Sequence, residues 1–263
     1  LQANANVADS HIAKARVLIL SNKLDAGKAE LTQSYRIDPK NFQFFMLATK
    51  VSEMEKKYDV AEKYLLAALP LAKDKDQKIR SYNYLGVIKQ DAKMDLDAIK
   101  YYQQGLQVDP KNDWLLGNCM NAYMDLEKWD EAIELGKKAM EISEHNIYRH
   151  VLANAYAHKG LAILNSGELK PAQELEAEKL FQSSLKLKAD QPNGIRGLGI
   201  LYFHMGKKQK DRILLTQAKQ YLERSFKHNP TDPYTIHNLI AVREALGLSG
   251  GVRMPAGDMK SGP

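Results

Sequence analysis

The chain has 263 residues, of which 44% are hydrophobic and 27% charged, values typical of a globular protein, and a mean hydropathy of −0.46. Its 38 basic and 32 acidic residues give a formal charge of +6, which favours acidic partners slightly and does not require nucleic acid. No apolar run approaches the roughly 18 residues that a membrane span needs, and the single cysteine, Cys119, excludes an internal disulfide.

The beginning of the chain does not have the features of an intact signal peptide. Residues 1–10 lack a basic region followed by an apolar stretch. The first residue is Leu1 instead of methionine, which indicates that a tag, a signal or a preceding domain was removed. We therefore expect a soluble protein of the cytoplasm or, if a signal was removed, of a periplasmic or secretory compartment.

Small residues recur in pairs along the chain, as they do where two antiparallel helices approach each other closely. The first-helix positions are Ala15, Thr49, Gly86, Met120, Ala155 and Gly199. The second-helix positions are Gly27, Ala61, Ala98, Ala132, Ala177 and Ala218. The two positions lie 12 residues apart in the first four pairs, and the second-helix positions there recur at intervals of 34, 37 and 34 residues. This constant offset predicts stacked helical hairpins.

The third pair carries the pattern most fully, with Tyr82, Leu85, Gly86, Ala98, Tyr102 and Pro110. Proline cannot continue a helix, so Asp38-Pro39, Asp109-Pro110 and Asn229-Pro230 mark turns between pairs. With this period, residues 8–246 resemble the tetratricopeptide repeat family. The resemblance implies an all-α, right-handed α-solenoid over residues 1–246, with about six hairpins, about 13 helices and no sheet.

The fifth and sixth pairs are longer than the others. Their two positions lie 22 and 19 residues apart, and the added segments are residues 165–176 and residues 207 to about 214. Leu175 and Leu180 continue an apolar pattern, which favours longer helices over a long loop. We therefore expect elongated hairpins over about residues 147–230, the first of them bending between Gly167 and Pro171 and projecting beyond the preceding units.

One last amphipathic helix is predicted for residues 233–246, where it would cover the end of the stack. Asp232 is its expected N-cap, Pro233 occupies its first turn and Gly247 ends it. Residues 247–263 are rich in Gly, Ser and Pro without a period, and they are predicted to form a flexible tail. The tail has three apolar residues that could hold it in a groove of this chain or of a neighbour: Val252, Met254 and Met259.

In the family that the chain resembles, the first helix of each hairpin lines a concave groove. The resemblance therefore places in the groove arginines that suit carboxylates, amides that suit a peptide backbone, and aromatic anchors. The candidate residues are Arg80, Asn83, Gln90, Trp114, Asn118, Asn121, Arg149, Tyr156, Lys159, Arg196, Phe203 and His204. For each of them the alternative is a side chain that is solvated or that fills space between helices.

The sequence contains no motif typical of catalysis. A glycine-rich phosphate loop and a serine elbow are both missing. His150 and His158 are eight residues apart, whereas metal-binding pairs lie three or four apart, so we expect both to be solvated. Cys119 lies at a packing position, which favours a buried thiol over a nucleophile. We therefore predict no enzymatic activity, no metal site and no cofactor.

The repeat pattern predicts a non-enzymatic adaptor or scaffold that binds a protein partner in its concave groove. The partner would be a peptide, of acidic character, or a helix. The alternative is a structural subunit that assembles with itself as a homo-oligomer, or within a larger complex, through the elongated hairpins. RNA binding is less favoured, because the net charge is modest and regular base-reading pairs are missing.

Overall fold

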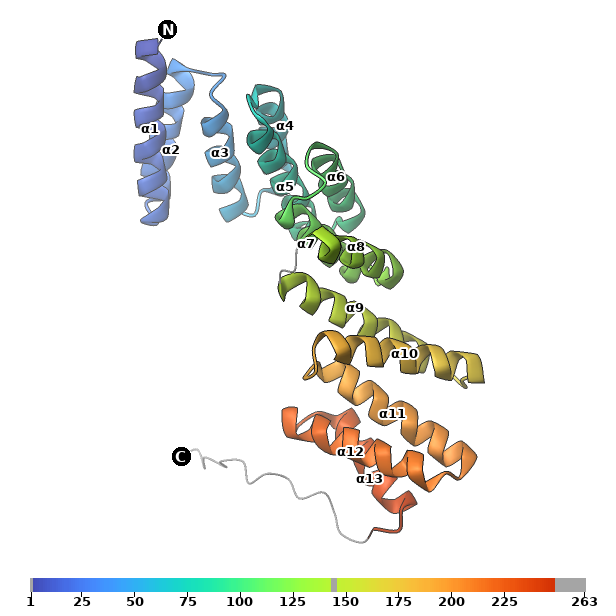
Figure 1. Ribbon diagram of the computed structural model, residues 1–263. Helices are drawn as coiled ribbons and strands as arrows, with labels where there is room; N and C mark the ends of the chain where they lie inside the picture. Colours follow the sequence, from blue (N-terminus) through green and yellow to red (C-terminus); the bar gives the residue numbers. More distant parts are fainter. Residues whose placement is uncertain (1, 143–145, 249–263) are drawn as a thin grey trace, which may run out of the picture. The chain divides into compact units, whose positions relative to one another are not determined.

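The computed structural model describes residues 2–142 and 146–248, and within these ranges it contains 13 α-helices, one short 3-10 helix and no strand (Figure 1). The prediction of an all-α fold is therefore confirmed. The chain divides into two compact units, residues 1–128 and 129–263, which we describe separately. The right-handed winding of a single solenoid over residues 1–246 stays a prediction.

The helices of each unit follow one another without intervening strands. The first unit contains α1 (Gln2–Leu20), α2 (Leu24–Ile37), α3 (Phe42–Met54), α4 (Tyr58–Ala68), η1 (Leu69–Leu71), α5 (Lys75–Asp91), α6 (Asp95–Val108) and α7 (Asp113–Asp125). The second unit contains α8 (Trp129–Ile142), α9 (Asn146–Leu164), α10 (Pro171–Leu187), α11 (Pro192–Gln209), α12 (Arg212–His228) and α13 (Pro233–Ala245).

The turn inside a hairpin is made by a residue with left-handed backbone conformation. Asn22, Lys56 and Lys93, with φ of 59°, 58° and 62°, lead into α2, α4 and α6, and Lys210, with φ of 55°, leads into α12. A side chain with a Cβ atom crowds the following carbonyl in this conformation, which costs roughly 1–2 kcal/mol. In the longer turn between α9 and α10, Gly167 takes a positive φ of 109°, which a glycine adopts without that strain.

Replacing Lys93 by glycine is expected to stabilise the first unit. The Lys93 side chain is exposed, and glycine removes the backbone strain while adding entropy to the unfolded chain. The free energy of unfolding in urea should rise by about 0.5–1 kcal/mol, the difference between these two effects. The matched control is Lys63→Gly, at an exposed position inside α4, which should lower it by about 1 kcal/mol. Equal losses in both variants would contradict a strained turn.

The joint between two hairpins ends one helix in extended backbone and caps the next helix. Asp38 and Asp109 follow α2 and α6 in extended conformation, each directly before a proline that predicts a turn. Asn41 then accepts hydrogen bonds from backbone N–H groups at the start of α3, and Asn112 accepts one from Leu115 at the start of α7. These caps satisfy N–H groups that have no partner within the helix.

The joint between α4 and α5 has a different structure. Here the 3-10 helix η1 follows α4, and the carboxylate of Asp74 accepts a 2.7 Å hydrogen bond from the N–H of Gln77 to cap α5. The additional residues of the 37-residue interval are therefore accommodated inside this joint, and the pairing of α5 with α6 keeps the ordinary offset.

Small residues lie where the helices of a hairpin touch, as the sequence predicts. Gly86 of α5 packs against the ring of the fully buried Tyr102 of α6, so that a Cβ atom on Gly86 would lie 2.1 Å from Tyr102 Cε1. In the same way, a Cβ atom on Gly199 of α11 would lie 2.8 Å from Leu222 Cγ of α12. In these two hairpins the paired helices thus bury their apolar faces against each other.

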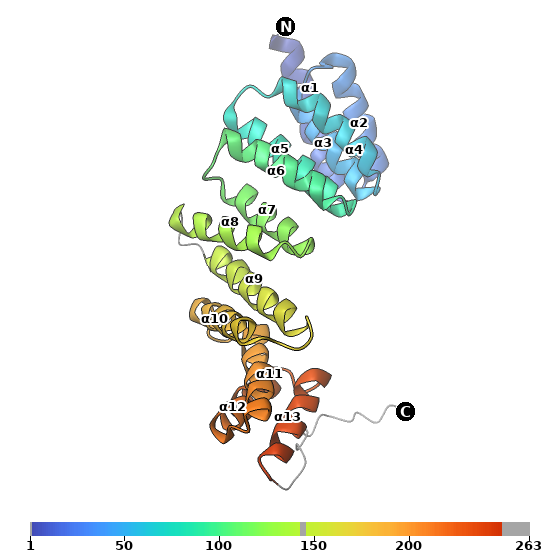
Figure 2. The ribbon, with the colours of Figure 1, turned by 90° about the vertical axis from the view of Figure 1, so that its right-hand side faces the viewer.

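The added segments of the fifth and sixth hairpins are helical in part: residues 171–176 belong to α10, and residues 207–209 and 212–214 belong to α11 and α12. Helices α9 and α10 have 19 and 17 residues, against 13 and 11 in α3 and α4, and they lie side by side (Figure 2). The turn between them runs from Asn165 to Lys170, and Pro171 begins α10. Phe181 of α10 is fully buried and packs against Gly160 of α9 and Gly197 of α11, so its ring contacts both neighbouring helices.

The last helix, α13, begins and ends where the sequence predicts. Asp232 accepts a 3.0 Å hydrogen bond from the N–H of Thr235, Pro233 is the first helical residue, and Gly247 follows the helix with a positive φ of 71°. Residues 249–263, which make up most of the predicted tail with its three apolar anchors, lie outside the described residues. Among the helices that are described, none is long and apolar enough to cross a membrane.

Candidate functional site

The candidate residues of the first unit lie on the first helices α5 and α7. Arg80 and Asn121 are exposed, and Trp114 has 68% of its surface exposed. Asn83 is buried, and its Oδ1 accepts a 2.8 Å hydrogen bond from Nδ2 of Asn118. This bond joins α5 to α7, so Asn83 and Asn118 position the two helices that carry the exposed residues.

Gln90 is held by polar contacts at the end of α5. Its Oε1 accepts a 2.6 Å hydrogen bond from the hydroxyl of Tyr102, and its Nε2 lies 3.3 Å from Oδ2 of Asp125 on α7. The amide therefore satisfies a largely buried tyrosine hydroxyl. Gln90 thus fills space between helices, which is the alternative that the sequence leaves open for each candidate residue.

In the second unit, α9 carries Arg149, Tyr156 and Lys159, which are all half-buried. The ammonium of Lys159 lies 2.6 Å from Oδ1 of Asp130 on α8 and 3.4 Å from Oε1 of Glu176 on α10. The hydrogen bond to Asp130 raises the pKa of Lys159. Lys159 thus bridges two neighbouring helices, whereas Arg149 and Tyr156 remain partly accessible on α9.

Helix α11 carries the last three candidates in different environments. Phe203 is buried in the core of the second unit, whereas His204 beside it is exposed. Nη1 of Arg196 lies 3.4 Å from the carboxylate of Asp232, and its guanidinium lies 5.8 Å from the ring centroid of Tyr234 on α13. Arg196 therefore holds α13 against α11.

His158 and Cys119 both have packing contacts. The ring of His158 stacks on Trp129 with a centroid separation of 5.3 Å and contacts Asn193, so this histidine is not simply solvated. Cys119 is buried, and burial raises the pKa of its thiol to about 12, which keeps the thiolate from forming at neutral pH. Within the described ranges, no three His, Cys, Asp or Glu side chains are grouped as metal ligands would be.

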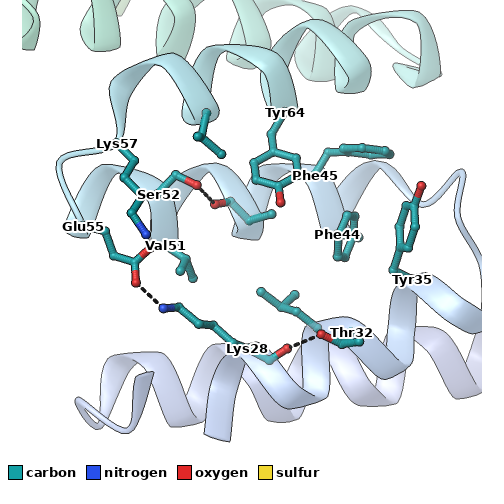
Figure 3. Close-up of a pocket in the computed structure, with 13 residues that line it drawn as sticks. Lys28, Thr32, Tyr35, Phe44, Phe45, Val51, Ser52, Glu55, Lys57 and Tyr64 are labelled. Atoms are coloured by element: carbon teal, nitrogen blue, oxygen red, sulfur yellow. Dashed lines mark hydrogen bonds and ion pairs between the residues drawn. The ribbon is translucent and has the colours of Figure 1, made fainter. Parts of the chain in front are cut away.

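A pocket of about 640 Å³ between helices α2, α3 and α4 was not identified from the sequence (Figure 3). We call it the α2–α4 pocket. Its lining consists of Lys28, Leu31, Thr32, Tyr35, Phe44, Phe45, Ala48, Val51, Ser52, Glu55, Lys57, Val60 and Tyr64. The adjacent aromatic residues Phe44 and Phe45 are the sequence feature that could indicate this pocket, but adjacent aromatic residues also occur at ordinary interfaces between helices.

A scan against protein-family models finds no match, and neither does a comparison with curated protein sequences. Solved structures do match. A tetratricopeptide repeat protein from Parabacteroides merdae ATCC 43184 has 15% identity and a TM-score of 0.54, over 79% of this chain and 74% of that one. YrrB, described as a TPR protein with an unusual peptide-binding site, has 15% identity and a TM-score of 0.54, over 79% of this chain and 96% of that one.

A third match is a chain of the APC/C hetero-tetramer Cut9-Hcn1, with 16% identity and a TM-score of 0.48. The match covers 89% of this chain and 42% of the matched chain, so this chain spans less than half of the length of that protein.

Proposed function

We propose that this chain, which has the tetratricopeptide-repeat fold, is a non-enzymatic scaffold that binds an acidic peptide on its first-helix face. Arg80 and Trp114 are exposed on the first helices α5 and α7 of the first unit, where a partner can reach them. YrrB, which has the same fold, is described as having a peptide-binding site, and this supports a peptide as the class of partner.

The observation that carries the proposal is the pair of exposed residues Arg80 and Trp114. They lie 34 residues apart and therefore occupy the same position on the consecutive first helices α5 and α7. The Asn83–Asn118 hydrogen bond fixes these helices one turn further along. Exposed tryptophan and arginine side chains are typical of the few residues that dominate binding energy at interfaces.

The two residues would have different roles in binding. Trp114 would bury an apolar side chain of the peptide, and Arg80 would form charge-assisted hydrogen bonds with a carboxylate. Exposed Asn121, on the same helix as Trp114, would hold the peptide backbone without reading its side chains. On α9 of the second unit, Arg149 and Tyr156 offer the same two kinds of side chain.

Substitution of Trp114 by alanine is expected to weaken peptide binding by about 2 kcal/mol or more, because water in the vacated space does not replace the contacts of a central anchor. Arg80→Glu should weaken it further, most strongly at low salt, because reversed charge repels an acidic peptide. The measurement is a fluorescence-polarisation titration with peptides selected on the wild-type protein from a display library. The melting temperature should change little, since both side chains are exposed.

The matched control is Ile213→Ala, which truncates an apolar residue with 72% of its surface exposed on the second helix α12. This variant should bind like the wild type. If Trp114→Ala and Arg80→Glu bind like the wild type while Ile213→Ala does not, the contact surface is the elongated hairpins. That result would favour the alternative of a structural subunit.

A further inference from the structure

The α2–α4 pocket has the size and the walls of a ligand site. Its volume of about 640 Å³ lies within the range in which proteins hold small molecules. Phe44, Phe45, Tyr35 and Tyr64 form one continuous group of rings, with centroids 4.8 Å apart for Tyr35 and Phe44 and 5.1 Å apart for Phe44 and Phe45. Such a wall attracts an apolar group of matching size.

The polar side chains of the pocket are concentrated on one side. Lys28 of α2 binds one carboxylate oxygen of Glu55, and Lys57, just before α4, binds the other (Figure 3). The hydroxyls of Thr32 and Ser52 donate to backbone carbonyls of their own helices, at 2.9 Å and 3.0 Å. The charged group formed by Lys28, Glu55 and Lys57 is therefore the polar feature offered to a ligand, and we call it the charged rim.

The charged rim carries a net charge of +1. Hydrogen bonds from Lys28 and then from Lys57 lower the pKa of Glu55, so its carboxylate is ionised at neutral pH. Two ammonium groups then face one carboxylate. Each ammonium has three N–H donors, and Glu55 does not use all of them. One further carboxylate would complete the charge balance of the rim.

We propose that the α2–α4 pocket binds a small amphiphile, an aliphatic or aromatic chain that ends in a single carboxylate. The chain lies against the wall formed by Phe44, Phe45 and Tyr64, and the carboxylate binds Lys28 and Lys57. The single excess charge favours a carboxylate, which carries one negative charge, over a phosphate monoester, which carries nearly two. The site is separate from Arg80 and Trp114, so it goes beyond the peptide surface proposed above.

The test is a calorimetric titration with dodecanoate below its micelle concentration, compared with dodecyltrimethylammonium, which has the same chain and the opposite charge. Dodecanoate is expected to bind at least about tenfold more tightly, because only it pairs with the lysines. Lys57→Gln neutralises the rim and should weaken dodecanoate binding by about tenfold, whereas binding of dodecyltrimethylammonium should not weaken, because the variant removes a repelling charge.

Two variants fill the pocket from different walls. Ala48→Phe and Val60→Phe should each abolish binding, and the second keeps the test valid if the first, at a buried position, disturbs folding. Circular dichroism checks that each variant is folded. The control is Leu66→Phe on α4, which enlarges a side chain outside the pocket and should bind like the wild type.

Several results would overturn the proposal. One is dodecanoate binding that is unchanged in Ala48→Phe and Val60→Phe, which places the site elsewhere. Another is equal affinity for the two amphiphiles, which removes the role of the rim. A third is the absence of dodecanoate binding together with binding of a peptide that ends in an apolar residue, which would make the pocket a docking site for a protein.

Discussion

Gly197→Ala is expected to lower the free energy of unfolding of the second unit by about 1–3 kcal/mol. A Cβ atom at this position would lie 2.2 Å from Cε1 and 2.4 Å from Cζ of Phe181, a ring that is fully buried and therefore has nowhere to move. Unfolding in urea can be followed through Trp129 in a Trp114→Phe background, in which the only remaining tryptophan belongs to the second unit.

The control for this prediction is the same substitution at Gly117 of α7. A Cβ atom there has open space, with no neighbouring atom within 4 Å, so only helix propensity acts and Gly117→Ala should raise the stability of the first unit by about 1 kcal/mol. Its unfolding is followed through Trp114 in a Trp129→Phe background, because Trp114 belongs to the first unit. Combining Gly197→Ala with Phe181→Leu should recover part of the loss, because leucine frees the space of the ring. A double variant that is no better than the sum of its parts would contradict the close contact.

Asp232→Ala is expected to loosen the attachment of α13 and to lower its free energy of unfolding by about 2–3 kcal/mol. The loss combines a missing helix cap with a missing buried hydrogen bond. The carboxylate of Asp232 accepts from the N–H and the hydroxyl of Thr235, and that hydroxyl also lies 2.9 Å from the buried hydroxyl of Ser225 on α12. Arg196 binds the same carboxylate from α11. Hydrogen exchange of the α13 amides in Asp232→Ala measures the loss.

The contribution of Asp232 should also depend on pH. Burial raises the pKa of Asp232, but hydrogen bonds from Thr235 and the charge of Arg196 outweigh it, and the pKa is lowered overall. A lowered folded-state pKa means that the stabilisation is present above the unfolded value, near 4, and is lost as the pH falls through the folded value. In Asp232→Asn this pH-dependent part should be missing. A stability difference between wild type and Asp232→Asn that stays constant down to pH 2 would contradict the assignment.

The sequence predicts those features that depend on neighbours within one hairpin. The contact between Gly86 and Tyr102 follows from a constant offset between two helices, and the start of α13 follows from Asp232 and Pro233. Both are local, because each involves residues less than one repeat apart. Helix rather than loop in the added part of α10 could likewise be inferred from Leu175 and Leu180, which keep the apolar period.

The environment of the candidate residues was harder to predict, because it depends on the next hairpin. The position of Asn83 on α5 predicts a place in the groove, yet its side chain is buried and bonded to Asn118 of α7. The position of Phe203 predicts an aromatic anchor in the groove, yet its side chain lies in the core of the second unit. The α2–α4 pocket depends on the spacing between α2 and α3, and no local pattern of residues encodes that spacing.

The 3-10 helix between α4 and α5 has a consequence for how this chain could have changed in evolution. In a fold where every helix contacts many others, additional residues in one connection displace distant contacts. Here η1 accommodates the additional length where it occurs, and the helix pairs before and after it keep the same internal offset. A linear array of hairpins therefore tolerates insertions one joint at a time, and length added to one hairpin, as in α9 and α10, does not disturb the pattern of the others.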